Sequence, residues 1–369
     1  MFSRLSDPAF PALASLGPVD LARNTGAPEA RFLRLRYQPG AQAMPHVSLG
    51  PGGGPPEGAI WFFAGDKARK LARRAKGARR DVPTQALFQA FPQDHRMPAL
   101  ATFVDGAIDL APALIGRLAA SPPVLIRYRP GLSATFRWMR QDGRLFFVKQ
   151  TRDSDVRMLA LVAGQLADAL RGTQLGVVPG RPLDAILESA PDRDVRDAIA
   201  QITGALRTLW SQTLVPVRLL SRSDHLLRGA QASQIIALAD EVAGQQAAGL
   251  LRRLENTQAP VRLRPIHADM KLEHAFLSGP MTTLIDTESL SLGDPEYDLA
   301  KLEMRLVMAQ ALGGIAPARA QVAVAEVRRD AGPHYDWFLT CARLQCARFF
   351  AQRLNPATIP LVRRMLTPC

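Results

Sequence analysis

Two aspartates and a histidine around a short turn are the residues of this chain best placed to do chemistry. Apolar runs Ala275–Leu277 and Thr283–Ile285 flank a Ser-Gly-Pro turn, a pattern that predicts a β-hairpin. Asp269 and His274 precede the first strand, and Asp286 directly follows the second. Because a hairpin brings the outer ends of its strands together, we expect these three side chains to converge. Carboxylates gathered so closely repel one another unless a cation or a transferable proton lies between them, so the pattern predicts a site.

The motifs around this hairpin occur in a recognisable order. Within about forty residues the chain carries His267-Ala268-Asp269 with His274 five residues later, then Ile285-Asp286, Gly293-Asp294-Pro295 and Asp298-Leu299-Ala300. This ordered set resembles the aminoglycoside phosphotransferase family, which comprises small-molecule kinases built on the protein-kinase-like fold. Each triplet alone arises often by chance, whereas the ordered set is specific.

The resemblance implies a role for each acidic residue. Asp269 is expected to be the catalytic base that accepts or aligns the proton of the acceptor hydroxyl. His267, the other residue that we assign to the catalytic loop, is expected to brace it through hydrogen bonds. Asp286 corresponds to the family's magnesium ligand, a hard carboxylate suited to a hard cation. Asp294 and Asp298 are expected to be structural, with Asp294 capping the helix that follows it.

His274 is a departure from the family pattern, which has an asparagine here that helps to bind the metal. A neutral imidazole ligates metals too, although it suits Mn²⁺ or Zn²⁺ better than Mg²⁺. Three interpretations follow: an active kinase with one metal or an altered metal, a pseudokinase that binds nucleotide, and a protein that binds neither. Because Lys149, Asp269 and Asp286 are all retained, we favour the active kinase, with ATP and Mg²⁺ as cofactors and Mn²⁺ as an alternative ion.

Upstream, the sequence predicts a small lobe of three strands. One strand ends at Arg127 to Gly131, the next starts at Ser133, and Phe146 to Lys149 form the third. The resemblance implies that Gly131 and Ser133 offer backbone N–H groups to the nucleotide phosphates, and that Lys149 pairs with them. Two features depart from the family. No glutamate lies between Thr151 and Gly172 to orient the lysine, and the hinge at Leu175–Leu183 follows the preceding helix after only a few residues.

An internal repeat precedes this lobe. Phe32 to Gly40 recurs as Val124 to Gly131, with Arg-Tyr-x-Pro-Gly shared, and each copy is followed by strand-like segments and a helical pattern. The first copy has no lysine in its aromatic strand, Ala59–Phe63. We therefore interpret residues 25–105 as a degenerate copy of the small lobe that carries no chemistry.

Residues from 183 onward read as a helical lobe with the hairpin inserted. Apolar positions recur every three or four residues through 183–255, and further helices are predicted at about 295–312, 317–330 and 335–354. The fold class we predict is α+β: a protein-kinase-like two-lobe fold with a small antiparallel β lobe and a larger helical lobe, preceded by a degenerate repeat of the small lobe. The predicted domains are residues 1–120, 121–182 and 183–369.

Composition restricts the class of protein. The 369 residues are 47% hydrophobic and 21% charged, which is typical of a globular protein, and we expect no membrane span and no secretory signal. Three cysteines do not suggest a disulfide framework, so we expect a reduced, cytoplasmic setting. The net charge of +13 is concentrated in a basic stretch at 66–80. Since no aromatic residues or nucleic-acid motif accompany it, we interpret it as a solvated helix face rather than a nucleic-acid patch.

Taken together, the sequence predicts an ATP-dependent phosphotransferase that acts on a hydroxyl of a small molecule. The helical lobe has few acidic clusters, so a neutral or anionic sugar or metabolite is a better acceptor than a cationic aminoglycoside. The alternative from another class is a non-catalytic scaffold whose N-terminal unit docks a partner. The sequence carries no signal for an oligomeric state. His46, His95 and His334 lie beside or near prolines and are expected in loops.

Overall fold

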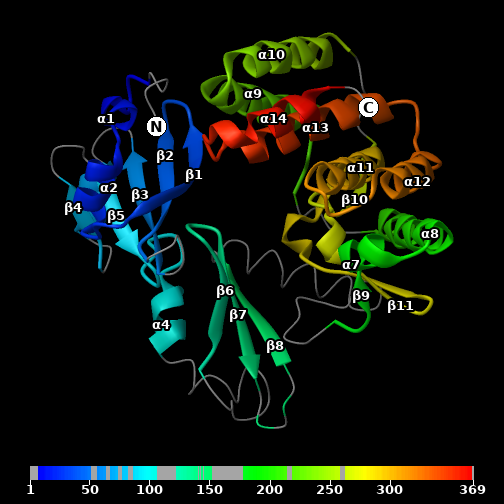
Figure 1. The fold of residues 1–369 in the computed structure, drawn as a ribbon, viewed down its shortest axis with the longest axis horizontal. Helices are drawn as coiled ribbons and strands as arrows, with labels where there is room; N and C mark the ends of the chain where they lie inside the picture. The colour runs from blue at the N-terminus through cyan, green and yellow to red at the C-terminus, as the bar shows by residue number, and fades with distance from the viewer. Residues whose placement is uncertain are drawn as a thin grey trace. The chain divides into compact units, whose positions relative to one another are not determined.

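The computed structural model describes residues 7–50, 56–63, 67–73, 77–81, 86–105, 122–139, 141, 143, 145–151, 178–213, 218–257 and 262–367. These residues form two compact units. The first unit holds residues 7–151 together with Gln352–Leu354, and the second holds residues 178–351 and 355–367. Sheets dominate the first unit and helices the second (Figure 1), which confirms the predicted α+β class.

A five-stranded antiparallel sheet forms the N-terminal half of the first unit. Its strand order is β1-β2-β3-β5-β4. The strands are β1 (Arg31–Gln38), β2 (Gln42–Ser48), β3 (Glu57–Phe63), β4 (Arg79–Asp81) and β5 (Ala86–Ala90). The helices of this half are α1 (Pro11–Ala14), α2 (Pro18–Thr25) and α3 (Lys67–Ala72), and α3 lies between β3 and β4 in the chain. Met44, Trp61 and Leu87 belong to the buried core on this sheet.

One histidine expected in a loop lies in this sheet instead. His46 is buried in β2, where its Nε2 lies 2.6 Å from Glu57 Oε2. The neighbouring Pro45 is accommodated within the strand opposite Leu35. The proline therefore did not end the strand, because the flanking apolar residues of β2 pack into the core on both sides of it.

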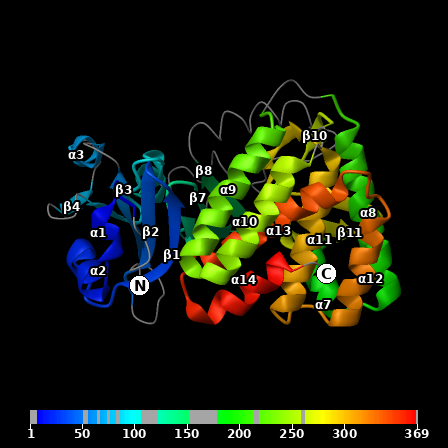
Figure 2. The same cartoon turned by 90° about the horizontal axis from the view of Figure 1, so that it is seen from above.

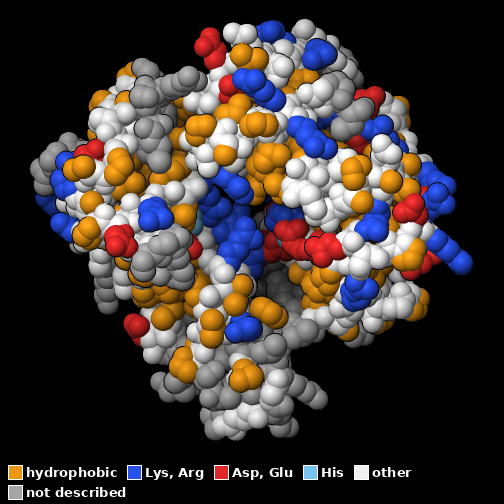
Figure 3. Space-filling view, in the orientation of Figure 1, with side chains coloured by type: hydrophobic (Ala, Val, Ile, Leu, Met, Phe, Trp, Pro, Cys, Tyr) orange, Lys and Arg blue, Asp and Glu red, His pale blue; other side chains and the backbone are white. Residues whose placement is uncertain are grey.

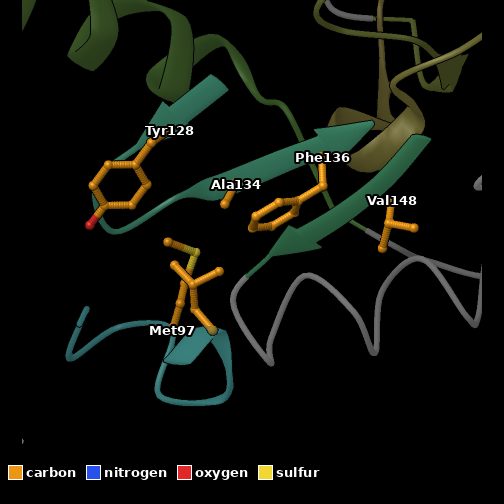
Figure 4. Packing of buried hydrophobic residues seen from close by; sticks show 6 residues of the cluster. Met97, Tyr128, Ala134, Phe136 and Val148 are labelled. Carbon is orange, nitrogen blue, oxygen red and sulfur yellow. The ribbon is translucent and has the colours of Figure 1, made fainter. Parts of the chain in front are cut away.

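A second, three-stranded sheet follows in the same unit, after α4 (Ala99–Asp105). Its antiparallel strands are β6 (Val124–Arg129), β7 (Ser133–Met139) and β8 (Leu145–Thr151), in that order. Tyr128, Ala134, Phe136 and Val148 pack with Met97 into a small buried core (Figure 4). This core fixes the strand register, because a slip of one residue would turn the apolar side chains to the other face.

Both sheets begin with the same turn. In the second sheet, the Tyr128 hydroxyl donates to Asp94 Oδ2 over 2.9 Å, and the N–H of Gly131 donates to the same oxygen. Gly131 has φ of 65°, in the left-handed region that glycine adopts without strain.

The turn of the first sheet repeats these contacts. Tyr37 donates to Asp7 Oδ2 over 2.6 Å, and Gly40 N donates to it over 2.9 Å. The shared Tyr-x-Pro-Gly sequence thus corresponds to one shared hydrogen-bonded turn, in which a buried carboxylate satisfies the hydroxyl and the backbone N–H. That the first sheet derives from the second as a degenerate copy stays a prediction.

The second unit is built from helices (Figure 2). They are α7 (Leu183–Ser189), α8 (Asp192–Trp210), α9 (Arg222–Ala239), α10 (Glu241–Asn256), α11 (Pro295–Ala311), α12 (Pro317–Arg328), α13 (Tyr335–Ala351) and α14 (Ile359–Leu366), with a 3₁₀ turn at Pro356–Thr358. Helix α13 packs against α9, α11 and α14 and forms the centre of the unit. Ser221, Asp240 and Asp294 cap α9, α10 and α11.

The predicted C-terminal helices agree with the structure to within a few residues. The last of the three ends at Ala351 rather than 354, because Leu354 adopts a positive φ of 48° and Asn355-Pro356 follows. Among the described residues, none of the helices is both long and apolar enough to cross a membrane. The buried cysteines Cys341 and Cys346 are free.

Short strands complete the second unit. The strands β9 (Arg181–Pro182), β11 (Ala275–Ser278) and β12 (Met281–Leu284) form a sheet of order β12-β11-β9. The strands β10 (Arg264–Ile266) and β13 (Ser291–Gly293) form an antiparallel pair. These two small sheets carry the segment with the predicted site.

Candidate active site

The predicted hairpin is present. Strands β11 and β12 pair from Ala275 opposite Leu284 to Ser278 opposite Met281, so the loop is the two residues Gly279-Pro280. A further backbone hydrogen bond, from Ile285 N–H to His274 O over 2.9 Å, joins the two residues just beyond the paired strands, at the end opposite the turn.

The hairpin brings the chemically active side chains together, as predicted. His274 Nε2 lies 3.1 Å from Asp286 Oδ2. Lys271 Nζ lies 3.0 Å from Asp269 Oδ2 and 3.8 Å from Asp286 Oδ2. The repulsion expected between the two carboxylates is therefore relieved by a lysine that contacts both.

Asp269 contacts a second lysine as well. Its Oδ1 lies 3.5 Å from Lys301 Nζ on α11, and the Lys301 side chain is only 5% exposed. Burial by itself would raise the pKa of Asp269, but the positive charges of Lys301 and Lys271 outweigh it and hold the pKa well below its usual range. The two lysines therefore favour the anionic form of Asp269.

Buried hydrogen bonds fix the loop that presents Asp269. Asp298 accepts from the backbone N–H groups of His267 and Ala268, each over 2.8 Å, and from Trp210 Nε1 over 3.1 Å. His267 Nε2 donates to Ile285 O over 2.8 Å. The loop and the hairpin are thus tied together directly, which matches the bracing expected of His267. Asp294 caps α11 by accepting from Glu296 N, as predicted.

Asp286 and His274 are suited to share one divalent cation. Burial lowers the pKa of His274 and so favours the neutral imidazole, and no described residue offers a hydrogen-bond partner to its buried Nδ1. No group of three or more His, Cys, Asp or Glu side chains able to hold a metal occurs among the described residues. The pair therefore fits a cation that takes its other ligands from phosphate and water, as Mg²⁺ commonly does.

The predicted nucleotide-binding residues belong to the first unit. Lys149 is half-buried on β8, opposite Thr135, and Ser133 is buried at the start of β7. The N–H of Gly131 is already donated to Asp94, so in this structure Gly131 shapes the turn. The helix predicted after β8, in which the family's glutamate is missing, falls within 152–177 and lies outside the described residues.

Three cationic side chains beside Asp269 were not predicted from the sequence. They are Lys271, Lys301 and Arg305. Lys271 could have been found, since it stands two residues after Asp269 in the loop. Lys301 and Arg305 come from α11, and only packing shows that this helix presents them to Asp269.

Lys301 is a positioning residue for Asp269, and we expect its loss to change the pH dependence. Without this positive charge, the pKa of Asp269 rises in Lys301→Met, so the acid limb of kcat/KM moves to higher pH. A pH–rate profile measures this shift. Lys67→Met, which removes an exposed lysine of α3, serves as the control and leaves the profile unchanged. Coincident profiles for Lys301→Met and wild type would contradict the assignment.

The sequence matches the family described as "Phosphotransferase enzyme family" over residues 119–334. The match covers more than half of the chain, and it includes the three-stranded sheet, the loop that carries Asp269, the hairpin and helices α7 to α12. The chain therefore belongs to this phosphotransferase family. No curated protein sequence matches it.

Solved structures show a similar fold. Aminoglycoside phosphotransferase APH(4)-Ia matches with a TM-score of 0.52 and 13% identity, over 73% of this chain and 96% of that one. A thermostable mutant of that protein, in ternary complex with ADP and hygromycin B, matches with 0.52 and 11%, over 71% and 96%. Choline kinase LicA from Streptococcus pneumoniae matches with 0.49 and 13%, over 72% and 99%.

Proposed function

We propose that this protein transfers the γ-phosphate of ATP to a hydroxyl group of a small molecule at the β11–β12 hairpin. The observation that carries the proposal is the convergence of Asp269, Lys271, His274 and Asp286 in one place. Phosphoryl transfer needs an aligned nucleophile and positive charge on the phosphate oxygens, and this group of side chains supplies both.

Asp269 is the residue that orients the acceptor. As a 30%-exposed carboxylate, it accepts a hydrogen bond from the acceptor hydroxyl and aligns the hydroxyl oxygen with the γ-phosphorus. A bond forms between that oxygen and phosphorus while the bond from phosphorus to the ADP oxygen breaks. The hydroxyl proton passes to Asp269 and then to solvent. Because the low pKa makes Asp269 a weak base, the proton leaves late, once the new bond has largely formed.

Asp286 and His274 are the residues that we propose hold the divalent cation. A bound Mg²⁺ or Mn²⁺ would neutralise the phosphate oxygens as charge moves toward ADP. The imidazole of His274 favours Mn²⁺ more than the amide of the family's asparagine would. Lys149 is proposed to pair with the α- and β-phosphates, with the turn at Gly131 and Ser133 beside them.

The proposed acceptor is a sugar or metabolite rather than a polycation. Similar structures include an aminoglycoside phosphotransferase in complex with ADP and hygromycin B. In this chain, by contrast, the side chains that contact Asp269 are lysines. The buried free thiols of Cys341 and Cys346 suit a reducing compartment such as the cytoplasm.

Thermal unfolding with nucleotide and metal tests the proposal. We expect ATP with Mg²⁺ or Mn²⁺ to stabilise the wild type, by about 2.7 kcal/mol when free ATP is 100-fold above its Kd. ATP without metal is expected to stabilise it less. Lys149→Met and Asp286→Asn should each lose most of the effect. If ATP with either metal leaves the wild-type melting temperature unchanged, the protein does not bind nucleotide and the scaffold alternative is favoured.

A further inference from the structure

Of the three cations near Asp269, Arg305 is the one that forms no ion pair with a carboxylate of the described residues. It lies on α11 four residues after Lys301, and residues at this spacing share one face of a helix. Within the described part of the chain, its Nε is buried and makes no hydrogen bond, and its Nη1 donates to Met308 Sδ over 3.7 Å. No carboxylate of the described residues forms an ion pair with it.

Neither Asp269 nor Asp286 explains why an arginine is placed here. Asp269 already contacts Lys271 and Lys301 through its two oxygens. Asp286 already contacts Lys271 and His274. A third cation on the same side adds repulsion toward both lysines, and a buried N–H without a partner costs further free energy. A bound anion would offset this repulsion and accept the unpaired N–H group.

We propose that Arg305 binds an anionic group, a carboxylate or a phosphate ester, on the same acceptor molecule that presents its hydroxyl to Asp269. The inference rests on the proposed function, and it specifies the class of acceptor. A guanidinium is planar and offers paired N–H donors that match the two oxygens of a carboxylate or a phosphate. The positive charges of Lys271, Lys301 and Arg305 would repel a cationic acceptor and so disfavour its binding.

The first unit also carries a group of positive charges, which is separate from Arg305. Arg34 lies in a group of like charges with Arg127, Arg129 and Arg353, and burial followed by these charges lowers its pKa to about 10. Figure 3 shows Lys and Arg side chains gathered near the centre of that view. Arg34, Arg127 and Arg129 lie on strands of the first unit, whereas Arg305 lies on α11, one helical turn after Lys301, which contacts Asp269. Of these arginines, Arg305 is the one on the helix that contacts Asp269.

Binding of matched sugars to the nucleotide-loaded protein tests the inference. The protein is first saturated with a non-hydrolysable ATP analogue and Mg²⁺, so that the phosphate-binding positions are filled. It is then titrated by calorimetry with D-glucuronate, D-glucose and D-glucosamine, which share a ring and hydroxyls but differ in charge, and with inorganic phosphate. The variants are Arg305→Gln, Arg305→Lys and, as a control, Arg252→Gln on the exposed face of α10.

We expect glucuronate or phosphate to bind the wild type and the Arg252→Gln control, with glucosamine the weakest ligand of all. Arg305→Gln should bind the anion about tenfold more weakly, and Arg305→Lys should keep part of the affinity. Equal binding of the anions to wild type and Arg305→Gln, or no anion binding at all, would overturn the inference. Failure of the ATP analogue to bind in the first step would instead count against the proposed function.

Discussion

Replacing Asp269 with asparagine is expected to lower turnover about 10³-fold while nucleotide binding persists. An amide has nearly the same shape as the carboxylate, but it cannot accept a proton and it aligns a hydroxyl less strongly. Lys301 also loses its anionic partner and Lys271 loses one of two, so the loop becomes more positively charged. ADP release in a coupled assay measures turnover, and a thermal shift with ATP and Mg²⁺ measures nucleotide binding.

The matched control for this variant is Asp192→Asn, which changes an exposed aspartate in the first turn of α8. It should keep wild-type turnover and wild-type stability. If Asp269→Asn retained turnover within about threefold of the wild type, Asp269 would not orient the acceptor, and the site would have to be assigned elsewhere.

Replacing Asp286 with asparagine should have a comparable effect on turnover for a different reason. Asp286 has φ of 66° and ψ of 43°, a left-handed conformation that asparagine tolerates well, so this variant preserves the backbone of the hairpin. It removes the negative charge that we propose holds the divalent cation. We expect turnover to fall about 10³-fold and to require much higher Mg²⁺ concentrations.

Measuring turnover against Mg²⁺ and Mn²⁺ concentration for Asp286→Asn separates this role from a structural one. Asp286→Ala provides the comparison, because alanine at positive φ adds strain of about 1 kcal/mol and should lower stability as well. A metal dependence of Asp286→Asn identical to that of the wild type would show that Asp286 does not bind the cation.

Much of this site was predictable because its signals are local. The turn residues, the alternating strands and the position of Asp286 directly after a strand define the hairpin, and the hairpin alone dictates that Asp286 and His274 meet. The cap by Asp294 was equally predictable, since an aspartate before a proline at the start of an apolar pattern favours a helix N-terminus.

The features that were not predicted depend on contacts distant in sequence. Lys301 contacts Asp269, and Arg305 lies near it, only because α11 packs beside the loop. The residue types alone suggest an exposed helix face. Gly131 was expected to face a phosphate, but Asp94, thirty-seven residues earlier, occupies its N–H. A carboxylate this far upstream gives no periodic signal that would connect it with a glycine turn.

The internal repeat illustrates both cases. The shared Tyr-x-Pro-Gly sequence predicted two similar turns, whereas the aspartates that hold them, Asp7 and Asp94, were not recognised as part of the repeat. The two sheets also share a register, since Gln42 pairs with Phe63 as Ser133 pairs with Thr151. In this register Trp61 of β3 occupies the position that Lys149 occupies in β8, two residues before the end of the strand. Trp61 is fully buried, and this position of the first sheet therefore offers no cation to a phosphate.

Transfer of a labelled phosphoryl group tests the central claim most directly. The protein is incubated with Mg²⁺, ATP carrying heavy oxygen in its γ-phosphate, and a pool of small metabolites, and the products are analysed by mass spectrometry. We predict at least one phosphate ester that carries the heavy oxygens, together with an equal amount of ADP, in the wild type and not in Asp269→Asn. Tight binding of ATP with Mg²⁺ but no labelled ester from any metabolite would contradict the account and identify the protein as a pseudokinase.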